Sequence, residues 1–359
     1  MLKTLDRYII RQFLGTFFFI LVTIMLIAVV FDISEKTQDF ARMTASVQQI
    51  VFNFYLNFII YYSNLFSGLL IFLAVLLFTS RIAHRTEIIA MLSSGVSFPR
   101  IMWPYFLAAT MLTALSLVIN HRVLPAANKI RLAFEEEHIR ATYFVDDKHM
   151  HREIAPGTIA YFESFNVQEK MGFRFSLEHW ENDALTRKLT SDRAQYDSLN
   201  GRWRISDYVL RTMDGNTERI QRGQMLDTVI NLKPSDMGQR WETAMAMSWT
   251  ELNDHIASKR AQGDGSLMPY LIEKHQRTSY PFATYVFTLI GVGIASRKVR
   301  GGTGLHLALG VLLSLLYVFA MKLTTVAATN AGLDPLLAVW IPNVVFAIVG
   351  IIIYRRAPK

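Results

Sequence analysis

Six long apolar segments constrain the fold of this chain more than any other feature. A helix of about 20 apolar residues is long enough to cross the hydrocarbon core of a bilayer. The fourth apolar segment, residues 282–295, is shorter than this length, and we expect its helix to begin before Pro281. The sequence therefore predicts six membrane-spanning helices, at residues 14–31, 55–78, 101–119, 282–295, 305–327 and 336–354.

Basic residues in the short flanks predict the orientation of these spans. Lysine and arginine gather on the cytoplasmic side of membrane proteins. The alternate flanks hold Lys36 and Arg42 after the first span and little after the fifth. We therefore expect both termini and residues 81–100 to be cytoplasmic, because their side holds Lys3, Arg7, Arg11, Arg81, Arg85, Arg100, Arg297, Lys298, Arg300, Arg355, Arg356 and Lys359.

The composition fits a membrane protein with one sizeable aqueous domain. The 359 residues are 52% hydrophobic and 18% charged, which is too apolar for an ordinary soluble protein and too polar for spans alone. The net charge of +8 is explained by the membrane flanks, so we expect no nucleic-acid partner. The absence of cysteine excludes disulfides, thiolate metal sites and cysteine nucleophiles.

The long insertion between the third and fourth spans is predicted to be the aqueous domain. Short segments rich in aromatic and β-branched residues are separated by turn residues, as in an all-β sandwich, jelly roll or open barrel. We predict strands at 158–165, 172–180, 203–211 and 219–232, helices at 125–140 and 248–259, and a flexible break at 263–265. The fold class is therefore α+β, with spans in residues 1–119 and 281–359 around a domain in residues 120–280.

A polar island at residues 81–100 separates the second and third apolar segments. Thr86 is a candidate cap for a short helix, Glu87 suits the positive end of its dipole, and Gly95 can end it. Ser97 and Pro99 can begin the next span. The pattern predicts a short helix with three apolar residues on one face: Ile88, Met91 and Leu92.

Two interpretations of this short helix remain open from its spacing alone. Permeases press such helices into a groove of a cytoplasmic partner, which would place Glu87 at an interface. An ordinary interfacial helix lying on lipid has the same pattern.

Catalytic and energy-coupling motifs are missing from the sequence. The phosphate-binding motif GxxxxGK[ST], the nucleophile elbow GxSxG and the zinc motif HExxH are all absent. The spans hold almost no carboxylates, which disfavours ion-driven transport and favours an external ATPase. His149, His151 and Glu153 resemble a metal site, but a strand end at the surface explains them better.

Basic residues near the outer ends of the spans are candidate anion ligands. Lys322 in the fifth span either snorkels to the interface or faces a cavity that holds an anionic headgroup. Lys36 and Arg42 follow the first span and could serve the rim of the same cavity. We expect His306 and Asn343 to form hydrogen bonds that pack helices.

Four stretches resemble one family of membrane permeases. They are LDRYIIRQF at residues 5–13, RTEIIAMLSSGVS at 85–97, EKHQRTSYPFATYVFTLIGVGIASRKVRGG at 273–302 and LDPLLAVWIPNVVFAIVGIIIYRR at 333–356. Together they resemble the lipopolysaccharide-export permeases of the LptF/LptG type, over essentially the whole chain. The β region matches only in its position between the third and fourth spans and in its pattern of short strand-like segments.

The resemblance implies a bacterial inner-membrane protein with a periplasmic β-jellyroll. It implies a cytoplasmic ABC ATPase dimer, a second six-span subunit in a heterodimer or homodimer, and a bitopic periplasmic jellyroll protein. The cofactors ATP and magnesium would belong to the ATPase, and none to this chain. By analogy spans one and five form a lateral gate, with Lys36, Arg42 and Lys322 near the lipid headgroup, and the ATPase contacts are Arg85, Glu87, Ile88, Met91, Leu92 and Gly95.

Two functions follow from these observations. In the first, the chain is a non-catalytic subunit of an ATP-driven transporter that extracts lipopolysaccharide from the membrane. In the second, it is a non-transporting scaffold or signalling protein whose outer domain is moved by an ATPase. The flank SEKTQDFARM holds fewer lysines than a strongly basic rim would, so the lipid phosphate pattern stays open.

Overall fold

A computed structural model describes residues 3–43, 45–139, 149–166, 169–215, 217–232, 234, 242–261, 267–296 and 303–357. The chain divides into two compact units. The helical unit comprises Met1–His138, Met245–Leu252 and Met268–Lys359, and the β unit comprises Ile139–Ala244 and Asn253–Leu267. Residues 120–138, 245–252 and 268–280 of the predicted aqueous domain group with the helices. The predicted break at 263–265 and the basic flank at 297–300 lie outside the described residues.

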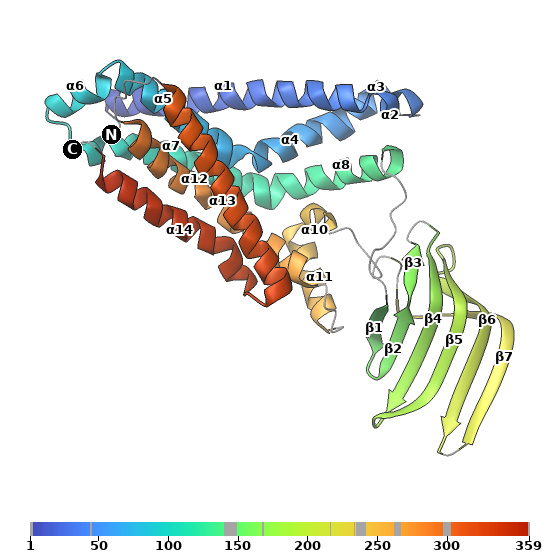
Figure 1. The fold of residues 1–359 in the computed structure, drawn as a ribbon. Coiled ribbons are helices and arrows are strands. Elements are labelled where there is room, and N and C mark those ends of the chain that lie inside the picture. The colour runs from blue at the N-terminus through green and yellow to red at the C-terminus, as the bar shows by residue number, and fades with distance from the viewer. Residues whose placement is uncertain are drawn as a thin grey trace. The chain divides into compact units, whose positions relative to one another are not determined.

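The described residues include six helices that are long and apolar enough to cross a membrane. The spans are α1 (Thr4–Glu35), α5 (Ser67–His84), α7 (Phe98–Val118), α12 (Met268–Ala295), α13 (Thr303–Ala331) and α14 (Pro335–Arg355), labelled in Figure 1. Helix α12 begins before Pro281, as predicted. The shorter helical elements are α2 (Thr37–Arg42), α3 (Val47–Gln49), η1 (Ile50–Tyr55), α4 (Leu56–Leu65), α6 (Glu87–Ser93), η2 (Ile119–Val123), α8 (Leu124–His138), α10 (Thr243–Ala246) and α11 (Trp249–Ala261).

The second span begins later than predicted because the helix is interrupted at Phe66. The Phe66 amide keeps the regular helical bond to the Tyr62 carbonyl, but the Phe66 backbone departs from regular helical angles, with φ −92° and ψ 0°. The Ser67 hydroxyl donates to the Asn64 carbonyl at 2.8 Å, and the turn at Phe66 separates α4 from α5. The apolar run at 55–78 is therefore two helices, of which only α5 qualifies as a span.

Helices α5 and α12 form the centre of the helical unit. In each of these two helices, two thirds of the most apolar 18-residue stretch is buried, whereas the buried share is 17% in α1 and 28% in α13. Helix α12 packs against α5, α7 and α14. A Cβ at Gly310 of α13 would overlap the Leu76 side chain, so this glycine lets α13 approach α5 closely.

Buried polar side chains join the spans, as predicted for His306 and Asn343. His306 Nδ1 lies 2.8 Å from the Ser80 hydroxyl. The Asn343 amide donates to the Ser279 carbonyl at 2.9 Å, and its oxygen accepts from the Tyr317 hydroxyl at 2.9 Å. Such bonds satisfy polar groups that no water reaches inside a membrane.

The β unit contains one seven-stranded antiparallel sheet (Figure 1). The order is β1-β2-β4-β5-β6-β7, and β3 pairs with β4. The buried face is aromatic, with Phe162, Phe175 and Trp203 almost fully buried and the Trp203 indole donating to the Leu232 carbonyl at 2.8 Å. The strands are β1 (Met150–Ala155), β2 (Thr158–Phe162), β3 (Ser164–Asn166), β4 (Met171–Glu181), β5 (Ala184–Asp197), β6 (Arg202–Asp214) and β7 (Thr217–Thr228).

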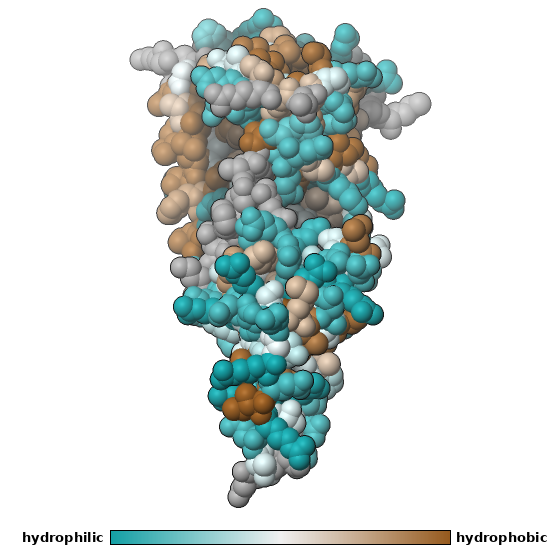
Figure 2. Space-filling view, turned by 90° about the vertical axis from the view of Figure 1, so that its right-hand side faces the viewer, coloured by the Kyte–Doolittle hydropathy of each residue, from teal (hydrophilic) through white to brown (hydrophobic). Residues whose placement is uncertain are grey.

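Two flanking helices were predicted from their patterns. Helix α8 matches the predicted helix at 125–140 as far as the description extends, and α11 matches 248–259. Ser248 caps α11, since its hydroxyl accepts from the Glu251 amide at 3.2 Å and Glu251 accepts from the Ser248 amide at 2.8 Å. In Figure 2, hydrophobic side chains line the flank of the helical unit, whereas hydrophilic side chains prevail over the sheet.

Candidate functional site

The short helix predicted in the polar island is present as α6. It follows the end of α5 at His84 and a turn at residues 85 and 86. Thr86 adopts a left-handed conformation with φ 61°, and its hydroxyl donates to the Arg85 carbonyl at 2.6 Å. Thr86 therefore occupies the N-cap position, as predicted, but its side chain makes no cap hydrogen bond. Its left-handed backbone differs from the extended conformation in which a capping side chain meets the helix N–H groups.

Gly95 ends the helix as predicted. Its φ of +86° is left-handed, its amide bonds to the Leu92 carbonyl at 3.0 Å, and the Val96 amide bonds to the Met91 carbonyl at 3.1 Å. This pair of bonds is the Schellman arrangement that favours glycine. Pro99 lies in the first turn of α7, as expected, and Ser97 occupies the cap position without a side-chain bond.

The three apolar residues of α6 lie on the face that packs against the helical unit. Ile88 is 2% exposed and belongs to the core around Phe98, while Met91 and Leu92 pack partly buried against the same core. On the opposite side Ile89 is 52% exposed. The apolar face therefore seats α6 on its own chain, whereas the turn before it and the opposite face of the helix are exposed.

Glu87 is held by a residue from the first span. Its Oε2 accepts a hydrogen bond of 2.9 Å from the Tyr8 hydroxyl, and the Arg85 Nη1 lies 4.0 Å from its Oε1. The Glu87 side chain keeps 31% of its surface exposed. The carboxylate is thus positioned by α1 and accessible from outside.

A second link joins the same end of α1 to the third span. Arg100 donates to both oxygens of Asp6, at 2.6 and 2.9 Å, and Asp6 also accepts from the Lys3 amide at 2.9 Å. The Asp6 side chain is only 3% exposed, which makes the bidentate pair an anchor of fixed geometry. Helices α1, α6 and α7 are therefore joined at this end.

The predicted headgroup residue Lys36 has partners within the chain. Its ammonium lies 2.7 Å from the Asp32 carboxylate and 4.5 Å from the centre of the Phe54 ring. The Tyr55 hydroxyl donates to the same carboxylate at 3.1 Å. Sequence reasoning missed this cluster, although the four-residue spacing of Asp32 and Lys36 indicates an ion pair on one helix face.

Lys322 and Arg42 lie in different helices. Lys322 is exposed on α13 beside the exposed Phe319 and Leu323, and its ammonium has no partner among the described residues. Arg42 is the last residue of α2.

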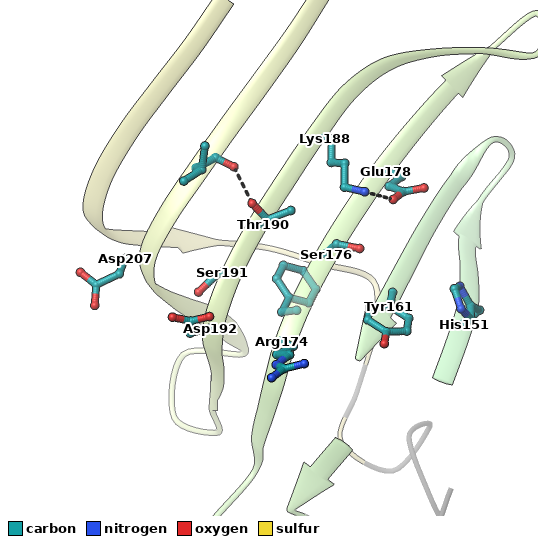
Figure 3. Close-up of a pocket in the computed structure, with 12 residues that line it drawn as sticks. His151, Tyr161, Arg174, Ser176, Glu178, Lys188, Thr190, Ser191, Asp192 and Asp207 are labelled. Atoms are coloured by element: carbon teal, nitrogen blue, oxygen red, sulfur yellow. Dashed lines mark hydrogen bonds and ion pairs between the residues drawn. The ribbon is translucent and has the colours of Figure 1, made fainter. Parts of the chain in front are cut away.

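A polar cleft of about 560 Å³ lies on the β unit (Figure 3). Glu178 and Lys188 point toward each other from neighbouring strands, with an ion pair of 2.7 Å. The hydrogen bond from Lys188 lowers the pKa of the Glu178 carboxyl. Arg174, Asp192 and Asp207 lie together in another part of the cleft. Charges of both signs make this cleft unlike the aromatic face of the sheet.

The described residues contain no group of three metal ligands. His149 Nδ1 lies 2.7 Å from the Tyr161 hydroxyl, and Glu153 accepts from the Gly157 amide at 3.0 Å. These partners agree with the interpretation of this segment as a strand end.

Six apolar helices, a β domain inserted between the third and fourth spans, and a short helix between the second and third define a multi-pass membrane protein of the α+β class. The family model described as "Lipopolysaccharide export system permease LptF/LptG" matches residues 7–356. The chain therefore belongs to the LptF/LptG family, as its motifs predicted. No curated protein matches it. Membership implies an inner-membrane protein of lipopolysaccharide export that is a transporter permease rather than an enzyme.

Proposed function

We propose that the chain is one permease subunit of an ATP-driven transporter that extracts lipopolysaccharide from the inner membrane. It passes the lipid to a periplasmic bridge toward the outer membrane. Its partners are a cytoplasmic ABC ATPase dimer, which holds ATP and magnesium, a second six-span subunit and a bitopic jellyroll protein. Both termini and α6 face the cytoplasm, and the β domain faces the periplasm.

One observation carries this proposal: a partly exposed carboxylate on α6 is hydrogen-bonded directly to α1. Glu87 can contact the ATPase while Tyr8 joins it to the first span, 79 residues away in sequence. Arg85 and Gly95 are exposed and complete the contact surface, whereas Ile88, Met91 and Leu92 pack against the core and seat the helix. Movement of the ATPase would thus be transmitted to α1.

The exposure of two spans supports their role as the gate. Among the six spans in the described part of the chain, α1 and α13 bury the smallest share of their apolar stretches. They are therefore available to lipid and to a second subunit. Lys322, Arg42 and Lys36 would offer cations to lipid phosphates at this gate, with Lys36 exchanging Asp32 for the phosphate.

Charge reversal at Glu87 tests the coupling. Glu87→Lys places a cation where the ATPase is expected to meet an anion and removes the acceptor for Tyr8, so lipopolysaccharide release should fall at least about tenfold. Release from proteoliposomes with the ATPase and ATP measures this effect. Asp254→Lys, a matched charge reversal at an exposed position of α11 outside the coupling segment, should retain export. Normal export by Glu87→Lys in a correctly inserted protein contradicts the proposal.

Lys322 separates the transporter from the scaffold function. Lys322→Glu should impair export by repelling the lipid phosphates, but a scaffold without a headgroup site would tolerate it. Photo-crosslinking from residue 322 adds a direct readout. A lipopolysaccharide adduct whose yield decreases during ATP turnover supports the gate. An adduct to ordinary phospholipid alone, with a yield that does not change with ATP, supports the scaffold function.

A further inference from the structure

A cleft of about 720 Å³ in the helical unit has no part in the proposed coupling or gate. One wall is formed by η2 and the start of α8, with His121, Arg122 and Lys129. The other wall is formed by the start of α11, with Ser248, Trp249 and Glu251. None of the residues that line it comes from α1 or α13.

Cations outnumber carboxylates around this cleft. Arg122 is exposed and has no ion-pair or hydrogen-bond partner in the described part of the chain. Lys129 meets Glu251 at 3.6 Å, but side-chain exposures of 71% and 54% make this a weak pair. Glu251 is moreover engaged in capping α11. A further ammonium, that of Lys274, lies 5.6 Å from the centre of the Trp249 ring.

An exposed apolar stripe leads from the third span to Arg122. Met111, Leu115 and Val118 are 57%, 45% and 56% exposed, and their spacing places them on one face of α7. Helices η2 and α8 extend α7 as one helix, and Arg122 and Lys129 on this extension line the cleft. Arg122 lies about one turn beyond Val118, within the π-helical segment η2. Apolar and cationic groups thus follow one another as in a lipid-facing surface that ends at a headgroup.

We propose that this cleft binds the phosphate of a membrane-lipid headgroup. The planar guanidinium group of Arg122 donates two hydrogen bonds to the phosphate. The Lys129 ammonium turns away from Glu251 and binds a second negative charge of the headgroup. Trp249 borders the cleft with a ring that suits the membrane–water interface, and the acyl chain lies along the stripe from Val118 to Met111. The inference requires only membrane insertion and does not rest on the proposed export function.

Native mass spectrometry of the detergent-solubilised full chain tests the site. Three probes are added separately: phosphatidylglycerol, lipopolysaccharide and inorganic phosphate. We expect the paired change Arg122→Glu and Lys129→Glu to weaken lipid binding at least about tenfold, because it replaces two attractions by two repulsions. The matched control, Arg219→Glu with Arg222→Glu, alters the same charge at exposed positions of β7 and should bind like the unaltered chain.

Each outcome decides between sources of the phosphate. Site-dependent binding of both lipids supports a general headgroup site, and site-dependent binding of lipopolysaccharide alone supports the site with that lipid as its ligand. Equal lipid retention by the two paired variants overturns the proposal. So does displacement of lipid by equimolar inorganic phosphate, which would identify a free-anion site. Arg122→Lys keeps the charge without the planar fork; a folded variant with intermediate affinity supports the proposal, and unchanged affinity in both Arg122→Lys and Arg122→Gln overturns it.

Discussion

At the scale of single residues, the hydroxyl of Tyr8 makes the most informative contact in the molecule. Tyr8→Phe removes the hydrogen bond to Glu87 and leaves the ring in place. A bond to a charged group contributes about 1.5–3 kcal/mol, less where water competes, as at the exposed Glu87. We expect export in proteoliposomes to fall several-fold while the Asp6–Arg100 anchor keeps the protein folded. Equal export by Tyr8→Phe and the unaltered chain would show that α6 acts on the spans by another route.

A second prediction at this scale concerns Glu178 and pH. The Lys188 hydrogen bond lowers the folded-state pKa of Glu178 below its unfolded value, so the pair stabilises the sheet above about pH 4.3. This stabilisation is lost as the pH falls through the folded-state pKa. The protection factors of the β4 and β5 amides, which correct hydrogen exchange for its intrinsic pH dependence, should therefore fall on acidification. In Glu178→Gln the part of this fall that belongs to the pair should vanish, and an identical pH profile would refute the assignment.

At the scale of elements, the sequence predicts what periodicity controls. The spans, the short helix at Glu87 and the aromatic strands follow from apolar runs and turn residues. Strand β5 escaped prediction because charged residues such as Arg187, Lys188 and Asp192 break its alternation; its stability comes from pairing with β4 and β6. The interruption at Phe66 depends on local hydrogen bonds within a continuous apolar run, which hydropathy cannot reveal.

The packing of α13 against α5 gives a prediction for one element. In Gly310→Ala the new methyl group would overlap Leu76 and force the helices apart, at a cost of about 1–3 kcal/mol. The unfolding temperature in detergent should fall. Gly304→Ala is the matched control on the same helix, because a Cβ there meets nothing within 4 Å. Equal unfolding temperatures for Gly310→Ala and Gly304→Ala would contradict a close contact between α13 and α5.

At the scale of the whole molecule, the candidate site combines segments that sequence patterns treat separately. The predicted coupling residues lie within eleven positions of one another, and their local geometry was largely predictable. The contacts that join them to the spans, from Tyr8 to Glu87 and from Asp6 to Arg100, cross 79 and 94 positions. No periodicity carries such information, because it arises only when tertiary packing brings α1, α6 and α7 together.

The membrane topology is the remaining property of the whole molecule that the coupling argument requires. The chain contains no cysteine, so a single introduced thiol reports its own compartment. Leu199 is 96% exposed in the turn between β5 and β6, and Ser94 is exposed after α6. In cells with a permeable outer membrane, an impermeant maleimide should label Leu199→Cys at once. Ser94→Cys should react only after the inner membrane is opened, because the basic flanks predict that residues 81–100 lie in the cytoplasm. Labelling of Ser94→Cys in intact cells would place α6 on the side without ATP and remove the basis for coupling through Glu87.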